Sequence, residues 1–189
     1  PNTHYSTYEC WNLIADFFAR HGYLPAIRPP KALLDAARAW LGDAITLQIR
    51  NNTKHVERNS TNAEWLGFVR ANPTVPIVIV CYPQERDGRF AKFANVRLAC
   101  DHHGIAMQLA MVYAAPIHLG LASGPAQMRW YQERPFAVFA EPIKTSRVRG
   151  MEEQAGGKRM PWMRGWPLIV AHERTETIQR EFDEMRAAA

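Results

Sequence analysis

The sequence contains little cysteine and no long apolar run, and each absence narrows the class of protein. Only three of its 189 residues are cysteines, Cys10, Cys81 and Cys100, and they form neither a CxxC pair nor a zinc-ligand spacing. We therefore expect three reduced thiols that pack as small apolar groups in a cytosolic protein. No apolar run approaches the roughly 18 residues that a membrane helix needs, and no secretory signal is visible at the start. These features predict a cytoplasmic protein, with peripheral attachment to a membrane as the alternative.

Several common enzyme motifs are also lacking. No GxSxG, P-loop, HExxH or GxGxxG pattern occurs, which removes the usual support for a nucleophile motif or a dinucleotide fingerprint. Hydrophobic residues make up 47% of the chain and aromatic residues 11%, which excludes a disordered, collagen-like or coiled-coil protein. The formal net charge of +5 suits a protein that handles anions, and we do not expect a nucleic-acid binder.

Residues 1–42 predict two helices that form a segment packing on the rest of the chain. A capping box at residues 6–9 precedes apolar residues at helical spacing, and Gly22 is placed to end this first helix. Pro30 suits the first turn of a second helix, which would end at Gly42. The apolar face of this second helix consists of Leu33, Leu34, Ala37 and Trp40.

From residue 43 onward the pattern changes to short apolar runs that alternate with helical segments. The expected strands cover residues 44–50, 75–81, 96–100, 117–121, 136–141 and 168–171. The expected helices cover residues 61–71, 104–114, 125–132 and 175–186, the first of them with a Thr61–Glu64 capping box. Continuously apolar strands between helices indicate a parallel sheet that is covered on both faces. Residues 43–189 are therefore predicted to form an α/β domain, a Rossmann-like doubly wound parallel sheet of five to six strands with helices on both faces.

A basic, irregular segment at residues 142–166 interrupts this pattern. Six Lys and Arg side chains stand there against two Glu side chains, so most of the surplus positive charge of the chain lies in this segment. Trp162 and Trp166 flank Arg164, a combination that can stack on bases or sugars. One candidate function is therefore a non-catalytic module that binds an anionic partner such as nucleic acid, lipid or acidic polysaccharide. The alternative is a loop whose aromatic side chains pack on another domain.

The residues that follow each expected strand are the candidates for a site, because ligands of open parallel sheets bind beyond the carboxyl ends of the strands. Ser123, Gly124 and Pro125 follow the strand at residues 117–121 and can begin a helix whose free N–H groups hold a phosphate or diphosphate. The alternative is an ordinary helix start, because helix N-termini generally favour Ser, Gly and Pro.

A second group of candidates follows the first expected strand. Arg50 can grip a phosphate with its guanidinium, and Asn51 and Asn52 can add directed hydrogen bonds. Lys54 and Arg58 supply further positive charge close behind. The alternative is a polar loop exposed to solvent.

A third group, Asp101, His102 and His103, follows the strand at residues 96–100. Two adjacent histidines with an aspartate suggest a metal site, but sequence neighbours seldom point at one site and no further ligand stands at helical spacing, so we expect no metal. Contact with a nucleoside base or ribose is one interpretation, and capping of the next helix by Asp101 is the other. His118 lies within an apolar strand, where a core histidine is expected more than a catalytic one.

Five segments between residues 44 and 141 carry a family resemblance: QIRNN, VIVCYPQERD, NVRLACD, AMQLAMVYAAPIHLGLASGP and QMRWYQERPF. In this order they resemble the C-terminal, nucleotide-sugar-binding domain of GT-B type glycosyltransferases, in which a helix-rich acceptor domain comes first and the donor lies between the two. The resemblance implies a metal-independent glycosyltransferase that uses no cofactor and takes a nucleoside-diphosphate sugar as donor substrate. It implies a carbohydrate or lipid-linked acceptor and an N-terminal domain in addition to these residues.

The resemblance also implies a place for each part of the donor. The diphosphate would lie between Arg50 and the turn at residues 123–125, with Lys54 as a second cation, and the base or ribose near Asp101 and the adjacent histidines. Side-chain cations and a helix end would then stabilise the departing nucleoside diphosphate. A sugar-nucleotide epimerase is the related alternative, for which the available acid and base groups are His102, His103, His118 and Glu141.

Overall fold

The computed structural model describes residues 16–23, 27–54, 56, 59–121, 123–130, 132, 134–140, 168–170 and 173–188. The helices are α2 (Lys31–Leu41), α3 (Asn62–Ala71), α4 (Ile105–Ala114), α5 (Gln127–Trp130) and α7 (Thr175–Ala188), and residues 16–21 are helical as well. The strands are β1 (Ile45–Gln48), β2 (Ile77–Val80), β3 (Val96–Leu98), β4 (His118–Leu121), β5 (Phe136–Ala140) and β6 (Leu168–Val170). Short 3-10 helices occupy Pro83–Glu85, Phe90–Lys92 and Ala99–Asp101. The basic segment and the start of the first expected helix lie outside the described residues.

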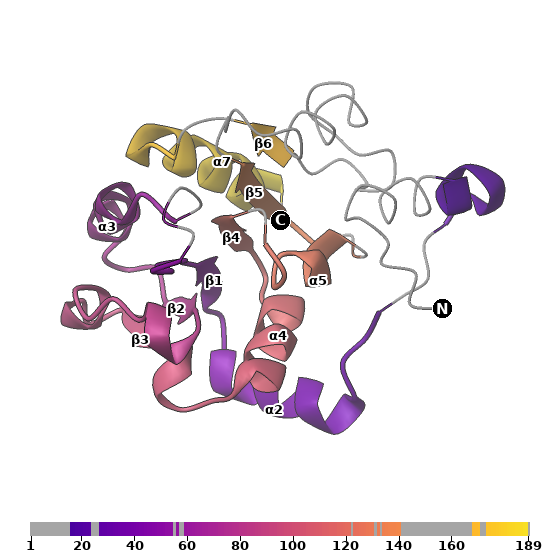
Figure 1. The fold of residues 1–189 in the computed structure, drawn as a ribbon, viewed down its shortest axis with the longest axis horizontal. Coiled ribbons are helices and arrows are strands. Elements are labelled where there is room, and N and C mark those ends of the chain that lie inside the picture. The colour runs from indigo at the N-terminus through magenta and orange to yellow at the C-terminus, as the bar shows by residue number, and fades with distance from the viewer. Residues whose placement is uncertain are drawn as a thin grey trace.

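The six strands form one sheet in the order β3-β2-β1-β4-β5-β6, and every neighbouring pair is parallel. β1 lies near the middle, where Ile45 is opposite Ile77 of β2 and Thr46 is opposite His118 of β4. Helices cover both faces of this sheet (Figure 1). The Rossmann-like, doubly wound architecture that the sequence predicts is confirmed.

The sheet is buried on both faces because alternate residues of each strand meet different helices. On one face, Leu47 of β1 belongs to a core cluster with Trp65 of α3 and Phe182 of α7. On the other face, Val80 of β2 belongs to a second cluster with α2 and with Met111 of α4. Figure 1 accordingly shows α3 and α7 on one side of the strands and α2 and α4 on the other.

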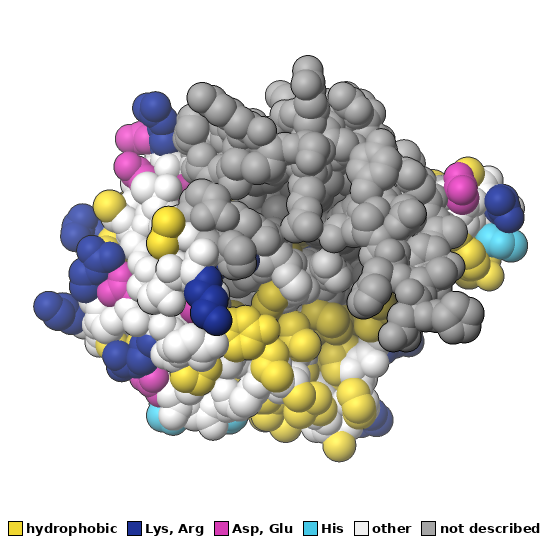
Figure 2. All heavy atoms as spheres, in the orientation of Figure 1, with side chains coloured by type: hydrophobic (Ala, Val, Ile, Leu, Met, Phe, Trp, Pro, Cys, Tyr) yellow, Lys and Arg dark blue, Asp and Glu magenta, His cyan; other side chains and the backbone are white. Residues whose placement is uncertain are grey.

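Helix α2 has the bounds that the sequence predicts. It begins after Pro30 and ends at Gly42, whose φ of 57° is one that other residues rarely adopt and whose N–H donates to the carbonyl of Arg38 at 3.0 Å. Ala37 and Leu41 are buried, and the helix packs along α4. Figure 2 shows hydrophobic side chains gathered over α2 and α4, so the apolar contact between these helices continues to the surface. None of the helices that the structure describes is long and apolar enough to cross a bilayer.

The expected Thr61–Glu64 capping box is wrong. Thr61 stands at the N-cap of α3, but it makes no side-chain cap hydrogen bond. The Glu64 carboxylate instead accepts hydrogen bonds from the backbone N–H and the hydroxyl of Thr175, both at 2.8 Å, and these bonds lower the pKa of Glu64. α7 begins at Thr175, beside α3, and the first backbone N–H groups of a helix have no partner within it. The Glu64 carboxylate therefore caps α7 and not α3.

Glu173, two residues before α7, also connects the start of α7 to α3. Its side chain is only 2% exposed, and its carboxylate accepts hydrogen bonds from the indole N–H of Trp65 at 2.7 Å and from the backbone N–H of Thr61. The N-terminus of α3 is therefore capped by a residue that lies 112 positions further along the chain. This contact brings the final helix onto the face of the sheet that α3 covers.

Helix α5 is shorter than the helix expected at residues 125–132. The backbone N–H groups of its first three residues bond three residues back, as in a 3-10 turn. The buried side chain of Arg129 donates to the carbonyl groups of Ala115 and Pro135, both at 2.9 Å, and burial lowers the pKa of this guanidinium to about 9. Helix α5 is thus held in place by the Arg129 side chain, which binds the end of α4 and the start of β5. The pattern of residues within the helix does not predict these contacts.

The two central strands approach closely where β4 passes β1. Gly120 lies opposite Gln48 in the register of the two strands. A Cβ atom at Gly120 would stand 2.6 Å from the Cβ of Gln48 and 3.3 Å from its backbone nitrogen. A side chain at this position therefore does not fit unless the strands move apart.

We expect Gly120→Ala to lower the free energy of unfolding by about 1–3 kcal/mol, because it overpacks a filled core. Urea unfolding followed by circular dichroism measures this loss. Gly124→Ala is the matched control, since Gly124 is exposed, a Cβ there meets nothing within 4 Å and its φ is not in the left-handed region. Equal stability of Gly120→Ala and the wild type would contradict the close approach.

Candidate functional site

The direction in which the chain crosses the sheet reverses between β1 and β4. β2 and β3 lie on one side of β1, whereas β5 and β6 lie beyond β4. α3, which follows β1, packs against α7 on one face, and α5, which follows β4, contacts α4 on the other. Ligands of open α/β sheets bind at the carboxyl ends of the strands beside such a reversal, because the helices leave in opposite directions there. This edge of the sheet is therefore the candidate site.

Gln48 and Ser123 join the carboxyl ends of β1 and β4. The side-chain amide of Gln48 donates a hydrogen bond to the hydroxyl of Ser123. Gln48 is 5% exposed, and its Oε1 has no hydrogen-bond partner among the described residues. A buried acceptor without a partner costs about 1–3 kcal/mol, so this oxygen is suited to a donor group of a ligand. The sequence analysis missed Gln48; the signal that could have found it is a polar side chain at the last position of an apolar strand.

Arg50 follows β1 by two residues and is half-buried. Its Nε is buried and finds no hydrogen-bond partner within the described part of the chain. Its backbone N–H donates to the hydroxyl of Ser60 at 2.9 Å, and its carbonyl accepts from the N–H of Ser60 at 2.9 Å. These two bonds close the base of the loop between β1 and α3, so the backbone of Arg50 is fixed while part of its guanidinium remains available to an anion.

Asn52 serves mainly as a scaffold for the same loop. Its backbone N–H donates to the side chain of Asn59 at 2.7 Å, and the side chain of Asn59 donates back to its carbonyl at 2.9 Å. Its side-chain amide donates to the buried carboxylate of Glu85 at 3.2 Å, and its side-chain oxygen accepts from the N–H of Lys54 at 2.8 Å. Asn51 and Lys54 are exposed on this loop. The contact with Glu85 ties the loop after β1 to the loop after β2.

The predicted turn at residues 123–125 precedes α5 and differs from a regular helix start. Ser123 and Pro125 are half-buried, whereas Gly124 is exposed and a Cβ there would meet nothing within 4 Å. The N–H groups of Gln127 and Met128 already bond to the carbonyls of Gly124 and Pro125, both at 3.1 Å. This turn can therefore offer a ligand the Ser123 hydroxyl and an open approach at Gly124, rather than the free N–H groups of a long helix.

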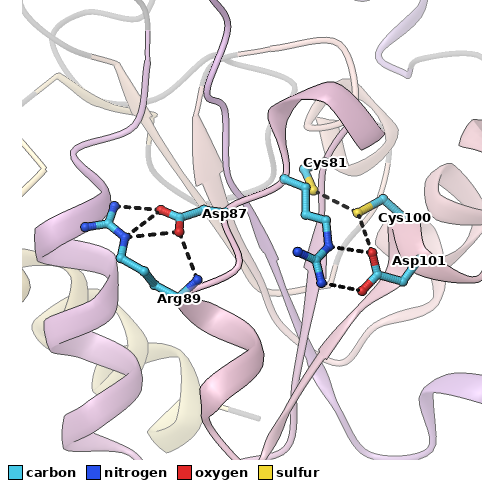
Figure 3. A network of polar contacts seen from close by, with 6 residues as sticks. Cys81, Asp87, Arg89, Cys100 and Asp101 are labelled. Atoms are coloured by element: carbon cyan, nitrogen blue, oxygen red, sulfur yellow. Dashed lines mark hydrogen bonds and ion pairs between the residues drawn. The ribbon is translucent and has the colours of Figure 1, made fainter.

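Asp101 stands at the end of the 3-10 helix that follows β3 and pairs with Arg86. The guanidinium of Arg86 donates to both carboxylate oxygens, at 2.7 and 3.1 Å (Figure 3). This pairing holds the pKa of Asp101 below its ordinary value, so the carboxylate is ionised at neutral pH. α4 begins after Gly104 without a side-chain cap, so the alternative in which Asp101 caps the next helix is wrong. The contact with a base or ribose stays a prediction, and Arg86 would stand beside it.

Cys81 and Cys100 lie next to this ion pair. Figure 3 shows the two thiols beside the Asp101 carboxylate, and their Sγ atoms are 3.3 Å apart. Both are free thiols, Cys81 buried and Cys100 half-buried. The two cysteines are 19 residues apart, and this spacing does not predict a contact between them, because only the pairing of β2 with β3 brings them together. Cys10, like Arg58 and Glu141, lies outside the described residues.

His102 and His103 turn toward α2 rather than toward Asp101 and its partner. The ring of His103 lies edge-on to Trp40 with centroids 4.9 Å apart, and the ring of His102 lies 6.4 Å from the same indole. The Nε2 of His103 is buried, with no partner in the described ranges. The three neighbours therefore do not converge on one point. In the part of the chain that the structure describes, no three His, Cys, Asp or Glu side chains are grouped to hold a metal ion.

His118 has the position of a core histidine. It is fully buried in β4, and its Nδ1 lies 2.9 Å from the hydroxyl of Thr46 on β1. Burial lowers the pKa of its imidazole well below the ordinary value, so the ring is neutral at pH 7. It is the first residue of β4, at the amino end of the strand, whereas a ligand would lie at the carboxyl end.

Comparison with known proteins supports the fold. No protein-family model matches the chain, and no curated protein matches its sequence. Two similar solved structures are E. coli heptosyltransferase WaaC with ADP, at 15% identity and a TM-score of 0.54, and the same enzyme with ADP-2-deoxy-2-fluoro heptose, at 14% and 0.53. They cover 91% and 89% of this chain but only 53% of the heptosyltransferase in each case, so the chain spans about half the length of that enzyme. At this identity the likeness shows that the chain shares the α/β fold of a glycosyltransferase.

Because His118 is buried, we expect acid to lower the free energy of unfolding. In the unfolded chain the imidazole titrates near 6.5, whereas in the folded chain its pKa is well below that value. The unfolded chain therefore binds a proton that the folded chain excludes, and stability is lost as the pH falls below about 6.5. We expect the free energy of unfolding in urea to decrease by up to about 1.4 kcal/mol per pH unit between pH ~6.5 and ~5.

Two variants test whether this dependence of the unfolding free energy on pH comes from His118. His118→Gln can still bond to Thr46 but does not titrate, so its stability should depend less on pH over the same range. His21→Gln removes an exposed histidine and should keep the slope of the wild type. An unchanged slope in His118→Gln would contradict the assignment.

Proposed function

We propose that this chain is a glycosyltransferase-like domain that binds a nucleoside-diphosphate sugar at the carboxyl ends of β1 and β4. The observation that carries the proposal is a buried pair of polar atoms at this edge, Arg50 Nε and Gln48 Oε1, neither of which has a partner in the described residues. A cationic donor and a neutral acceptor on residues two positions apart suit a ligand that carries both phosphate oxygens and hydroxyl groups. The heptosyltransferase of the same fold, whose structures contain ADP or an ADP-sugar, supports this choice of ligand.

Arg50 would have the central part in the reaction. When the bond between the sugar and the diphosphate breaks, negative charge builds up on the departing nucleoside diphosphate. The guanidinium of Arg50, whose backbone is fixed by Ser60, would stabilise that charge in a partly desolvated place. Lys54 on the same loop would add a second positive charge, and Asn51 a hydrogen bond. In this scheme the charge is neutralised by side chains, and no metal takes part.

The strand end of β4 would hold the other side of the diphosphate. Ser123 is tied to Gln48 and thereby to β1, so its hydroxyl has a fixed position beside the reversal of the chain. Gly124 is exposed, which lets a ligand approach the backbone of the turn. The nucleoside would then extend toward the end of β3, where Asp101, His102 and His103 are the candidates for contact with the ribose or base.

The acceptor would be bound outside this chain. Because the chain spans about half of the heptosyltransferase, we propose that it is the donor-binding half of a two-domain enzyme, with a carbohydrate or lipid-linked acceptor on the other domain. Such an enzyme would work in the cytoplasm, with contact to a membrane surface where the acceptor is lipid-linked. The epimerase alternative loses one of its acid–base candidates, because His118 is enclosed in the sheet, and the basic segment of the anion-binding alternative lies outside the described residues.

Calorimetric titration of the chain with ADP, UDP and GDP tests the proposal. We expect one of these nucleotides to bind, and we expect Arg50→Gln to weaken that binding roughly ten- to a hundredfold, because a hydrogen bond to a charged group contributes about 1.5–3 kcal/mol. Arg38→Gln is the matched control, since Arg38 is an exposed arginine in the last turn of α2 and its loss changes the net charge equally.

The control variant separates a specific site from general attraction of anions. Arg38→Gln should bind the nucleotide as the wild type does. Absence of binding at millimolar nucleotide, or equal weakening by the two substitutions, would overturn the assignment of the site to Arg50.

A further inference from the structure

Cys81 and Cys100 occupy matching positions on neighbouring strands. In the register of β2 and β3, Ile77 pairs with Val96 and Ile79 with Leu98, and two residues further along each strand stand the two cysteines. At the last paired residues, Ile79 and Leu98, the strands run about 4.8 Å apart, and the two cysteines follow by two residues each. A disulfide bridges Cα separations of about 4.4–6.8 Å, so the two segments need only stay about as close as the strands that precede them. The thiol of Cys81 already donates to the Sγ of Cys100 at 3.3 Å (Figure 3). Little movement is therefore needed to join the two sulfur atoms.

The two thiols differ in exposure, and this difference sets the order in which they can react. Cys81 is 6% exposed and belongs to the core cluster under α3 and α7, whereas Cys100 is half-buried at the margin of that cluster. An oxidant from solvent therefore reaches Cys100 first. Burial raises the pKa of both thiols, so each is protonated at neutral pH and the pair is stable as two thiols until an oxidant is supplied.

The surroundings of the pair leave room for a crosslink. Cys81 follows the last paired residue of β2, and Cys100 lies in the 3-10 helix after β3, so neither is held in the ladder of the sheet. Asp101, next to Cys100, is fixed by Arg86 from the connection between the two strands. The sulfur atoms are thus close together while the backbone that carries them lies beyond the regular sheet.

We propose that Cys81 and Cys100 form a dithiol site that closes to a disulfide on reaction with a low-molecular-weight disulfide such as glutathione disulfide. The Cys100 thiolate attacks one sulfur of glutathione disulfide, which forms a mixed disulfide and releases one glutathione. The Cys81 thiolate then attacks Cys100 Sγ, which forms the protein disulfide and releases the second glutathione. Each cysteine gives up its thiol proton before its sulfur attacks, and each released glutathione takes up a proton. In all, the protein loses two protons and two electrons, and one glutathione disulfide becomes two glutathione thiols. The second step is intramolecular, and the 3.3 Å separation favours it.

The test uses the full chain with Cys10→Ser, so that the two cysteines of the site are its only thiols. The folded protein is incubated with glutathione disulfide, blocked with iodoacetamide, digested with trypsin and analysed by mass spectrometry without reduction. Trypsin can cut after Arg86, Arg89, Lys92 and Arg97, so the two cysteines fall in different peptides. We expect both thiols to be lost, one crosslinked peptide pair that is lighter by two hydrogen atoms than its parts, and full recovery of the thiols with dithiothreitol.

A second variant traps the intermediate. In Cys81→Ala with Cys10→Ser, the mixed disulfide between Cys100 and glutathione has no thiol to resolve it and should persist. In the Cys10→Ser protein, two intact thiols after incubation, a lasting glutathione adduct on Cys100, or a crosslink that forms only in urea would each overturn the proposal. The readout is the thiol content of the protein, so the result is independent of whether the chain binds a nucleotide.

Discussion

The parallel pairing of β1 with β4 is the contact on which the rest of the structure depends. The sheet is built outward from it, with β2 and β3 added beside β1 and β5 and β6 beside β4. Gly120 lets the two strands approach closely enough for this pairing, because any Cβ there would collide with Gln48. The hydrogen bond between Thr46 and His118 joins the same pair of strands, so part of the centre of the sheet is polar. Gln48 Oε1 and His118 Nε2 are buried there without a partner among the described residues.

The same pairing explains why the candidate site lies at one edge of the sheet. Both faces are sealed by helices, with α3 and α7 over one and α2 and α4 over the other, and a ligand can reach only the ends of the strands. At the carboxyl ends of the two central strands, Gln48 bonds to Ser123 and keeps an acceptor that no other described residue uses, and Arg50 follows two residues later. Neighbouring strands bring the Asp101–Arg86 pair and the two thiols to the adjoining part of the edge. The buried sheet thus supports the side chains that gather at this edge.

The sequence predicted those features that depend on near neighbours along the chain. The bounds of α2 follow from Pro30 and Gly42, and continuously apolar strands correctly indicated a parallel sheet covered on both faces. The position of polar residues after strands also pointed to Arg50 and Ser123, and the structure bonds Ser123 to Gln48, two residues before Arg50. The sequence did not show that Arg86 binds Asp101, that His102 and His103 turn toward Trp40, or that Arg129 binds the end of α4 and the start of β5. Each of these contacts joins different elements, and only the packing of those elements brings the groups together.

Sequence alone therefore determined the main helices and strands, the class of the sheet and which strand ends carry polar side chains, since these follow from backbone preferences and the period of burial. Only the tertiary structure decided which groups these side chains bond to. Glu64 illustrates the difference: its spacing from Thr61 suits a capping box, but α7 packs beside α3 and supplies the unpaired groups of Thr175. Hydrogen bonds are short-ranged, so a carboxylate, a guanidinium or a thiol binds whichever group the packed strands and helices place within about 3 Å, and that choice is made by the fold.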